Sequence, residues 1–477
     1  MRVYWRPRPG HARVRFDAPW TREVASCHEW KRRVPDTSLA AAADAAKGWP
    51  ANIEPTQEYL AARTFLEQGR GHLFVTGRAG TGKSTLLTCL RGFLSGEMVL
   101  LAPTGLAAVN IGGQTIHSFF GFPPRLIRPD DIRRSRNGRL MRRLKFLVID
   151  EVSMVRSDLM WAIDQSLRLN RGRPREAFGG LRLALFGDLH QLPPVIHDAE
   201  VAEHLESTYG GPFFFSLPAL REGAGTALIE LTQVFRQRDE TLLAVLNRIR
   251  EGEADAADLA LLNARVHAIR TLSEGEDYVI LTPTNAAANR INMAYLERLP
   301  GAPCPYPAAT AGEFSEAARP TEETLLLKRG AKVMLLRNDP DRRWVNGTIA
   351  RISRLEEGRV WVEIAGEEHE VERASWESRR YAFDKDAEKI VETVAGTFTQ
   401  FPLRLAWALT IHKSQGLTLD KVYIDLGRGT FAHGQAYVAL SRCRSLAGLA
   451  LARPLRPSDI LFDPAATGYR RAFEALS

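Results

Sequence analysis

The stretch GRAGTGKST, residues 77–85, decides the fold of this chain. It follows an apolar run over 72–76 and precedes another over 86–90, as expected where a buried strand turns into a helix. Glycine admits backbone conformations closed to residues with a Cβ, so the N–H groups of such a loop can converge on phosphate oxygens. The stretch therefore predicts a P-loop at the end of a strand.

This loop carries the side chains that phosphate chemistry requires. We expect Lys83 to reach the β and γ phosphates of a nucleotide and Ser84 to offer its hydroxyl to Mg²⁺. A Gly-rich turn without a ligand is the alternative. Gln57, ahead of the loop, could pair with both edges of adenine through its amide, although solvent exposure is equally open. The loop residues expected to bind nucleotide are Gly77, Gly80, Thr81, Gly82, Lys83, Ser84 and Thr85.

The composition is that of a globular protein with a basic surface. The 477 residues are 45% hydrophobic and 25% charged, with a net charge of +8, so we expect about two to four domains and a polyanionic partner. The four cysteines are far apart, which argues against a disulfide framework or a structural zinc site. The sequence has no apolar run as long as a membrane span, and we expect a cytoplasmic protein, associated with the nucleoid if it is bacterial.

The first 33 residues are rich in basic and aromatic side chains. They hold nine Arg or Lys against three acids, with alternation typical of a strand over 12–16 and a helical pattern over 21–33. Cations and aromatics together suit the phosphates and bases of nucleic acid. A small packed extension with a solvated basic face is the other interpretation.

Acidic and amide side chains follow two further predicted strands. Asp150 and Glu151 come after the apolar run 146–149, and we expect Asp150 to hold Mg²⁺ through water and Glu151 to deprotonate the attacking water. Gln191 follows the strand predicted over 181–186, where an amide can sense whether a γ-phosphate is present. All three are candidates for the hydrolysis of a bound nucleotide.

Polar residues also follow the strand predicted over 98–102. Thr104 and Gly105 would lie at its carboxyl end, where open α/β sheets bind ligands. His117, with the two phenylalanines after Ser118, could stack on or hydrogen-bond to a single nucleic-acid strand. We assign the two phenylalanines themselves to the core.

Two segments have the composition of insertions. Residues 122–145 hold nine basic residues against two acids, with three prolines, which indicates a loop that projects from the sheet and faces phosphate. Residues 344–383 alternate in short runs broken by Asn-Gly, Glu-Gly and Gly-Glu, which indicates a small β-barrel.

The second half repeats the pattern of strands followed by polar residues. Strands are predicted over 278–282 and 403–410. Donors at matching points after them would hold a nucleic-acid backbone without reading its sequence. The residues expected to do so are Thr282, Thr284, Asn285, His412, Lys413 and Ser414.

Eight blocks of sequence occur in order between about residues 53 and 455. They are GRAGTGKST, LLAPTGLAAVNIGGQTIHSFFG, LVIDEVSMVRSDLM, LFGDLHQLPPV, LTQVFRQ, LTPTN, ALTIHKSQGLTLD and QAYVALSRCRS. This series resembles the petite-integration-frequency helicases of superfamily 1B, relatives of the RecD helicases. The resemblance implies an α/β fold of two tandem RecA-like P-loop NTPase lobes with ATP clamped between them. It also implies a small basic insertion in the first lobe and a small β-barrel insertion in the second.

The resemblance implies roles for single residues as well. Arg236 and Arg442 would reach the γ-phosphate from the second lobe, for which a guanidinium is suited because it is always charged and forks onto phosphate. Phe235 would cover the adenine ring, and Gly416 would lie at the nucleotide. The domains would be 1–50, an extension outside the resemblance; 51–225, the first lobe, with a wedge-like insertion at about 122–145; and 226–477, the second lobe, with the barrel at about 340–395.

The activity that the resemblance implies is that of a motor. ATP and Mg²⁺ would drive movement from 5′ to 3′ on single-stranded DNA and the unwinding of forked duplexes, or of four-stranded guanine structures, in replication, repair, recombination or telomere maintenance. We expect no membrane partner and a monomer as the acting form. Three other interpretations are open: a RecD-like subunit of a recombination nuclease, a DNA-binding or annealing clamp that uses ATP for release, and a P-loop kinase or metabolic ATPase with an incidental basic surface.

Overall fold

The computed structural model describes residues 49–50, 53–94, 96, 98–194, 196, 198–233, 239–267, 278–384, 389–430 and 432–475. The basic stretch at the start of the chain, Phe235 and Arg236 lie outside the described residues, and so do the interpretations that rest on them. Within the described ranges, no helix combines the length and the apolar character needed to span a bilayer.

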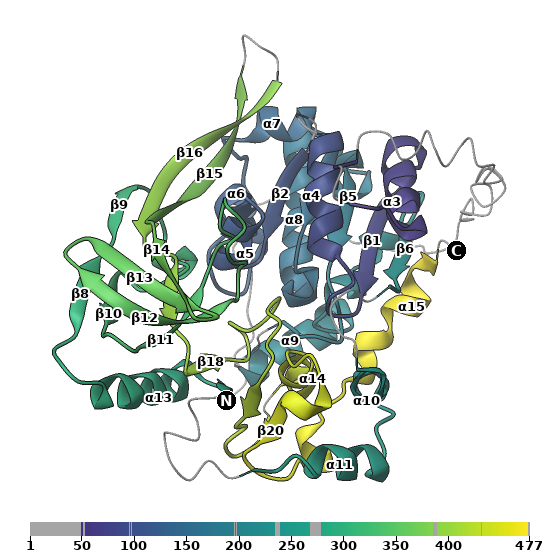
Figure 1. The fold of residues 1–477 in the computed structure, drawn as a ribbon. Helices are drawn as coiled ribbons and strands as arrows, with labels where there is room; N and C mark the ends of the chain where they lie inside the picture. Colours follow the sequence, from purple (N-terminus) through teal and green to yellow (C-terminus); the bar gives the residue numbers. More distant parts are fainter. Residues whose placement is uncertain are drawn as a thin grey trace, which may run out of the picture.

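The first lobe is built on a seven-stranded parallel sheet in the order β21-β6-β1-β5-β4-β2-β3 (Figure 1). In β1, Leu73 and Val75 face the helices α3 and α4, while Phe74 faces α8 on the other side. Because both faces are covered, the strands are nearly continuous apolar runs. The bounds are β1 His72–Gly77, β2 Met98–Ala102, β3 Gln114–Thr115, β4 Phe146–Ile149, β5 Arg182–Phe186, β6 Thr226–Leu231, β21 Glu474–Ala475, α3 Gln57–Gln68, α4 Lys83–Phe93 and α8 Ser157–Arg171.

The second lobe is built on a four-stranded parallel sheet in the order β18-β7-β19-β20. Leu281 of β7 faces α10 and α14, and Ile280 faces α13 on the other side. Two parallel sheets covered by helices confirm the two-lobed α/β fold. The bounds are β7 Val279–Thr282, β18 Ala408–Thr410, β19 Val422–Ile424, β20 Leu449–Leu451, α10 Glu240–Glu251, α13 Asn285–Arg298 and α14 Gln435–Leu440.

Antiparallel strands inserted in the second lobe lie on the left of Figure 1. They form a five-stranded sheet, β14-β13-β12-β11-β17, a three-stranded sheet, β15-β16-β9, and the pair β10-β8. The five-stranded sheet includes β11, ahead of the expected start at residue 344, and the strand predicted over 403–410 is divided between β17 and β18. The bounds are β8 Cys304–Pro307, β9 Ala309–Gly312, β10 Thr324–Leu327, β11 Lys332–Leu335, β12 Ile349–Glu356, β13 Arg359–Ile364, β14 Glu367–Val371, β15 Ala374–Asp384, β16 Lys389–Gln400 and β17 Leu403–Leu405.

The hairpin β15–β16 extends from this insertion along the first lobe (Figure 1). Leu100 N on β2 donates a hydrogen bond of 3.1 Å to Tyr381 Oη on β15. Arg91 of α4 forms an ion pair with Glu392 of β16, at 2.7 Å. The insertion of the second lobe is therefore in direct contact with the first lobe.

The basic segment 122–145 is packed against the first lobe rather than projecting from it. Ile127, Leu140, Met141 and Leu144 are buried in the core of that lobe. Three of them lie in or just after a short helix, α7 Gly138–Arg143, whose arginines at the intervening positions face outward. Helical spacing of the apolar residues accounts for this, because it gives the segment one buried side and one basic side.

The C-terminal segment returns to the first lobe, so the expected division at residue 225 is corrected. β6 pairs with β1 along its whole length, and β21 pairs with β6 in the same sheet. The rings of Tyr469 and Phe473 pack on Phe74 with centroids 5.6 and 5.7 Å apart. Apolar residues near the end of the chain thus complete the core of the first lobe.

Candidate active site

The P-loop joins β1 to α4 and has three glycines with positive φ angles. Gly80 and Gly82 have φ angles of 83° and 86°. Gly77 has φ 150°, and a Cβ on it would lie 2.7 Å from both Leu231 O and Thr81 Oγ1. Side chains at these positions would strain or block the loop. The glycines therefore fit a phosphate cradle at the N-terminus of α4.

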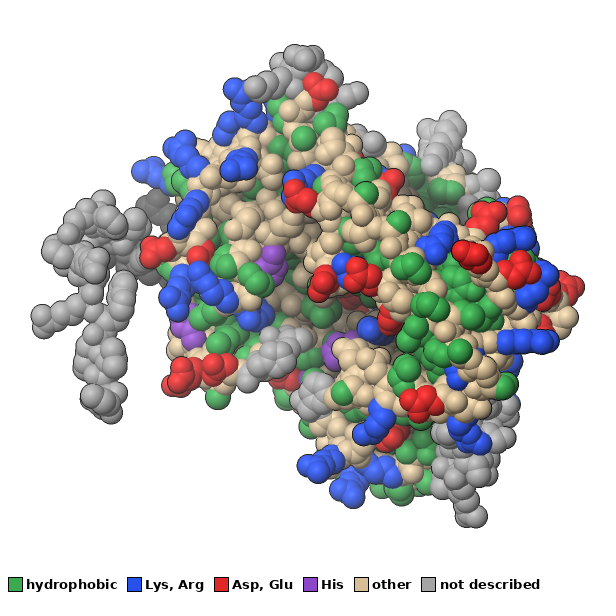
Figure 2. Space-filling view, turned by 90° about the vertical axis from the view of Figure 1, so that its left-hand side faces the viewer, with side chains coloured by type: hydrophobic (Ala, Val, Ile, Leu, Met, Phe, Trp, Pro, Cys, Tyr) green, Lys and Arg blue, Asp and Glu red, His purple; other side chains and the backbone are tan. Residues whose placement is uncertain are grey.

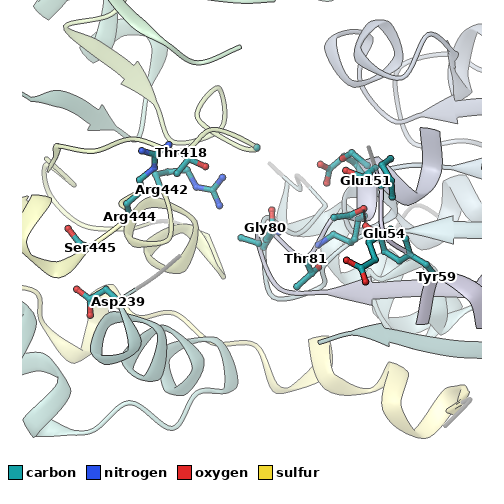
Figure 3. Close-up of a pocket in the computed structure, with 18 residues that line it drawn as sticks. Glu54, Tyr59, Gly80, Thr81, Glu151, Asp239, Thr418, Arg442, Arg444 and Ser445 are labelled. Atoms are coloured by element: carbon teal, nitrogen blue, oxygen red, sulfur yellow. Dashed lines mark hydrogen bonds between the residues drawn. The ribbon is translucent and has the colours of Figure 1, made fainter. Parts of the chain in front are cut away.

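A cavity of about 1080 Å³ separates this loop from the second lobe (Figure 3). Figure 3 shows Gly80, Thr81 and Glu151 on one side of it and Arg442 and Arg444 on the other. Its volume is slightly larger than the range of about 300 to 1,000 Å³ that is typical of small-molecule sites. The lining residues are Ile53, Glu54, Tyr59, Ala79, Gly80, Thr81, Gly82, Lys83, Ser84, Thr85, Glu151 and Gln191 from the first lobe, and Asp239, Gly416, Thr418, Arg442, Arg444 and Ser445 from the second.

Glu151 has a left-handed backbone conformation at this cavity. Its φ of 49° and ψ of 41° are uncommon for a residue with a side chain, and such strain is concentrated at functional sites. Burial and the neighbouring Asp150 raise the pKa of Glu151 to about 7, while Lys83 acts in the opposite direction. A carboxyl group with a pKa near neutrality suits a general base.

Lys83 belongs to the same group of charges. Its Nζ donates to Gly77 O at 2.6 Å and to Arg78 O at 3.0 Å. Burial lowers the pKa of Lys83, while the carboxylates of Asp188 and Glu151 act in the opposite direction. The lysine thus lies among the acids that flank the loop.

Oxygen ligands for a divalent cation lie beside the P-loop. Ser84 and Asp150 line a second cavity, which shares Ser84, Glu151 and Gly416 with the first. Burial raises the pKa of Asp150, while the N–H of Glu151 and the charge of Lys83 act in the opposite direction. A hydroxyl and a carboxylate are the hard oxygen ligands that Mg²⁺ takes in phosphate sites, so these two residues fit that ion.

Arg442 and Gln191 approach the cavity from opposite lobes. Arg442, just after α14, is 1% exposed, and its Nε donates to Val438 O at 2.9 Å while Nη2 donates to Ser441 Oγ at 2.8 Å. Gln191 follows β5, and its Nε2 donates to Asp188 Oδ2 at 3.1 Å. The Arg442 side chain is therefore held by groups of the second lobe, and the Gln191 side chain by a carboxylate of the first.

Among the described residues, hydrogen bonds join the lobes next to the cavity. Ala79 N in the P-loop donates to Tyr437 Oη of α14 at 3.5 Å. His433 Nε2, just before α14, lies 3.2 Å from Leu189 O in the first lobe. The helix that precedes Arg442 is thus held against both the P-loop and the loop that carries Gln191.

Not every expected nucleotide residue faces the cavity. Gln57 is exposed at the start of α3 and does not line it, so solvent exposure is what the structure shows for this side chain. Gly77 does not line the cavity either, and its carbonyl oxygen accepts a hydrogen bond from Lys83 Nζ. Phe235 and Arg236 lie outside the described residues. Of the two arginines expected to reach the γ-phosphate from the second lobe, Arg442 is therefore the one that the structure describes.

Four of the expected DNA contacts have structural partners for their hydroxyl groups. Thr104 and Thr284 each cap a helix, α5 Gly105–Asn110 and α13, by accepting a hydrogen bond of 3.2 Å from a backbone N–H. Thr282 and Ser414 are 1% and 0% exposed, and each hydroxyl donates to a nearby backbone carbonyl. The last two therefore lie beneath the surface rather than on it.

The other expected DNA contacts have different surroundings. Asn285 and Lys413 line one cavity of about 210 Å³ beside α13. Burial lowers the pKa of both His117 and His412, which favours the uncharged form of each ring. A Cβ on Gly105 would lie 2.8 Å from Cα of Ala318, in the insertion of the second lobe. This glycine therefore allows the first lobe and that insertion to pack closely.

Sequence reasoning missed several residues of the cavity. Tyr59 donates its hydroxyl to Gly82 O at 2.7 Å, and its ring stacks on that of Trp49 with centroids 5.8 Å apart. Helical spacing gave no signal that Tyr59 would meet the P-loop. Thr418 and Arg444 lie inside the blocks ALTIHKSQGLTLD and QAYVALSRCRS, and that position was a usable signal.

A glycine cradle and paired acids on one lobe, opposed by an arginine on another, define a P-loop NTPase whose nucleotide site lies between two lobes. Residues 57–257 match the PIF1-like helicase family. The chain is 34% identical over 436 residues to the ATP-dependent DNA helicase Pif1 of Bdellovibrio bacteriovorus. This alignment covers 89% of the chain and 93% of that relative. The chain belongs to the PIF1-like helicase family.

Another relative and three solved structures also belong with the Pif1 helicases. The ATP-dependent DNA helicase PIF1 of Homo sapiens is 32% identical, over 87% of the chain and 67% of that protein. Unliganded Pif1 from Bacteroides sp is 36% identical with a TM-score of 0.81, over 88% of the chain and 97% of that structure. Bacteroides Pif1 bound to ssDNA has the same identity and coverage but a TM-score of 0.62. Bacteroides sp Pif1 in complex with ADP-AlF4 has a TM-score of 0.80. The arrangement of this chain is therefore nearer to the unliganded and ADP-AlF4-bound structures than to the ssDNA-bound one.

Proposed function

We propose that this chain is an ATP-dependent DNA helicase that hydrolyses ATP between its two lobes. The observation that carries the proposal is the shared cavity, with the P-loop and Glu151 on one lobe and Arg442 on the other. A nucleotide that touches both lobes draws them together, and its hydrolysis weakens that bridge. If contacts to DNA release alternately, each cycle moves the strand.

The chain's own residues account for the hydrolytic step. Glu151, with a pKa of about 7, takes a proton from the water that attacks the γ-phosphate. Lys83 and Arg442 stabilise the negative charge of the transferred phosphoryl group, and Gln191 senses the γ-phosphate. Ser84 and Asp150 would hold Mg²⁺, which neutralises phosphate charge when bound.

Three observations support DNA as the partner. Solved Pif1 structures are described as bound to ssDNA and as unwinding forked dsDNA. The net charge of this chain is +8, and Figure 2 shows Lys and Arg side chains gathered along the left-hand edge of one face. Asn285 and Lys413, beside one cavity, can hold a DNA backbone.

Movement from 5′ to 3′, a monomer as the acting form and a cytoplasmic location are parts of the same proposal.

ATP turnover with and without single-stranded DNA tests this function. Turnover of the wild type should rise strongly with DNA, and Glu151→Gln should lower it by about 10²- to 10⁴-fold while nucleotide binding is kept. Glu67→Gln, on exposed α3 surface, is the matched control. Turnover that ignores DNA would favour a metabolic ATPase.

A further inference from the structure

A loop of the first lobe is held inside the second. Residues 187–194 follow β5, and Leu192, 1% exposed, belongs to the hydrophobic core of the second lobe with the apolar side of α10. Gly434, at the start of α14, lies so close that a Cβ on it would clash with the carbonyl oxygens of His190 and Gln191. The loop that carries Gln191 is therefore fitted to the second lobe.

Arg250, in the last turn of α10, reaches from the second lobe into the first. It is 2% exposed, and its Nη2 lies 3.4 Å from Asp188 Oδ1 while Nη1 lies 3.4 Å from Glu230 Oε1. A charge buried to this degree is tolerated only where it is paired. Arg250 is thus tied to the same loop through Asp188.

The ionisation of Asp188 decides how Gln191 is oriented. Burial alone would raise the pKa of Asp188, but the charges of Arg250 and Lys83 outweigh burial, and the pKa is lowered to about 2. An ionised carboxylate only accepts hydrogen bonds. Gln191 must therefore turn its NH₂ toward Asp188, as it does at 3.1 Å, and its amide oxygen points elsewhere.

We propose that Arg250 is a positioning residue for ATP hydrolysis, which fixes the orientation of the Gln191 amide through Asp188. The proposal rests on the proposed function, since it assigns Gln191 to the hydrolytic site. Because Arg250 belongs to one lobe and Asp188 to the other, the amide is set only when the lobes are seated together. Arg250 does not line the cavity, so its effect falls on turnover rather than on ATP binding.

Steady-state ATP turnover at saturating single-stranded DNA tests this role. In Arg250→Gln, kcat should fall about 10- to 100-fold while KM for ATP changes less than about threefold. Arg250→Lys, which keeps the charge, should restore part of the lost kcat. Arg248→Gln is the matched control, because it removes an ion pair of the same helix that lies inside the second lobe, with Asp258. It should change kcat less than about twofold.

A second variant guards against misfolding. Arg250→Gln leaves Asp188 buried without its arginine partner, whereas Asp188→Asn combined with Arg250→Gln leaves no such buried carboxylate. Glu230, which also loses Arg250, is 35% exposed and remains solvated. Asparagine both donates and accepts, so the Gln191 amide still loses its fixed orientation and kcat should still fall. A combined variant with the kcat of Arg248→Gln would overturn the proposal. A wild type that does not hydrolyse ATP would instead overturn the proposed function, so the two failures are distinguishable.

Discussion

Arg442 and Glu151 face one cavity from opposite lobes, close enough for their charges to interact. Burial and Asp150 raise the pKa of Glu151, and Lys83 and Arg442 act in the opposite direction. One of the charges that tune the candidate base therefore comes from the second lobe. The hydrolytic site is complete only when the two lobes are together, as expected where closure and chemistry are coupled.

Replacement of Arg442 should lower ATP turnover without lowering the affinity for ATP. Arg442→Ala should slow ATP turnover about 10³-fold, while nucleotide affinity is kept because the P-loop and Lys83 are unchanged. Arg444→Ala is the control, since Arg444 also lines the cavity but pairs with Asp420 at 2.8 Å on the surface, and its turnover should fall less than about tenfold. Near-normal turnover in Arg442→Ala would remove this arginine from the chemistry.

The free energy of unfolding should fall in mild acid because of His72. Its ring is buried, and Nδ1 accepts a hydrogen bond of 3.0 Å from Leu183 N. Burial, followed by the charge of Arg182, lowers the pKa of His72 from 6.5 to about 4. Between these values the unfolded chain binds a proton that the folded chain does not. The stability is therefore full above pH 6.5 and is lost as the pH falls toward 4.

Urea unfolding of the wild type and His72→Asn checks this sign. Asparagine keeps an acceptor near the position of Nδ1 but does not titrate. Between about pH 7.5 and about pH 5, the wild type should lose about 2 kcal/mol more than the variant. His190, whose pKa is also lowered to about 4 by burial and Arg250, contributes equally to both proteins. Equal losses would show that His72 is not the source.

Binding of single-stranded DNA should depend on salt. If about six phosphates are held, log affinity should fall with log salt concentration at a slope of about −4, measured by fluorescence anisotropy. Lys413→Ala should reduce the slope by about 0.7. Lys421→Ala is the control, because Lys421 precedes β19 and lies at the opposite end of the sheet. A flat salt response would contradict an electrostatic grip on DNA.

Local pattern was enough to predict the strands around the nucleotide site. The apolar runs 98–102 and 146–149 are β2 and β4 with those bounds, because parallel strands covered on both faces are continuously apolar. The P-loop could be predicted because phosphate binding needs glycines and a lysine at fixed spacing between a strand and a helix. These features depend on residues close together in the chain.

Contacts between distant segments could not be predicted in this way. Tyr437 and Ala79 are 358 residues apart, and no periodicity relates them. Arg250 is one of many basic residues in the sequence, and its burial depends on β6 and α10 meeting across the lobes. Gln57 is a case that the sequence left open between adenine contact and solvent exposure, and in the structure it is exposed and does not line the cavity.

Strand separation of tailed duplexes tests the central claim most directly, that hydrolysis between Glu151 and Arg442 drives movement along one DNA strand. With ATP, the chain should separate a duplex that carries a 5′ single-stranded tail and leave a matched 3′-tailed duplex paired, and Glu151→Gln should separate neither. Equal separation of both duplexes by the wild type, or separation of neither, would contradict the account.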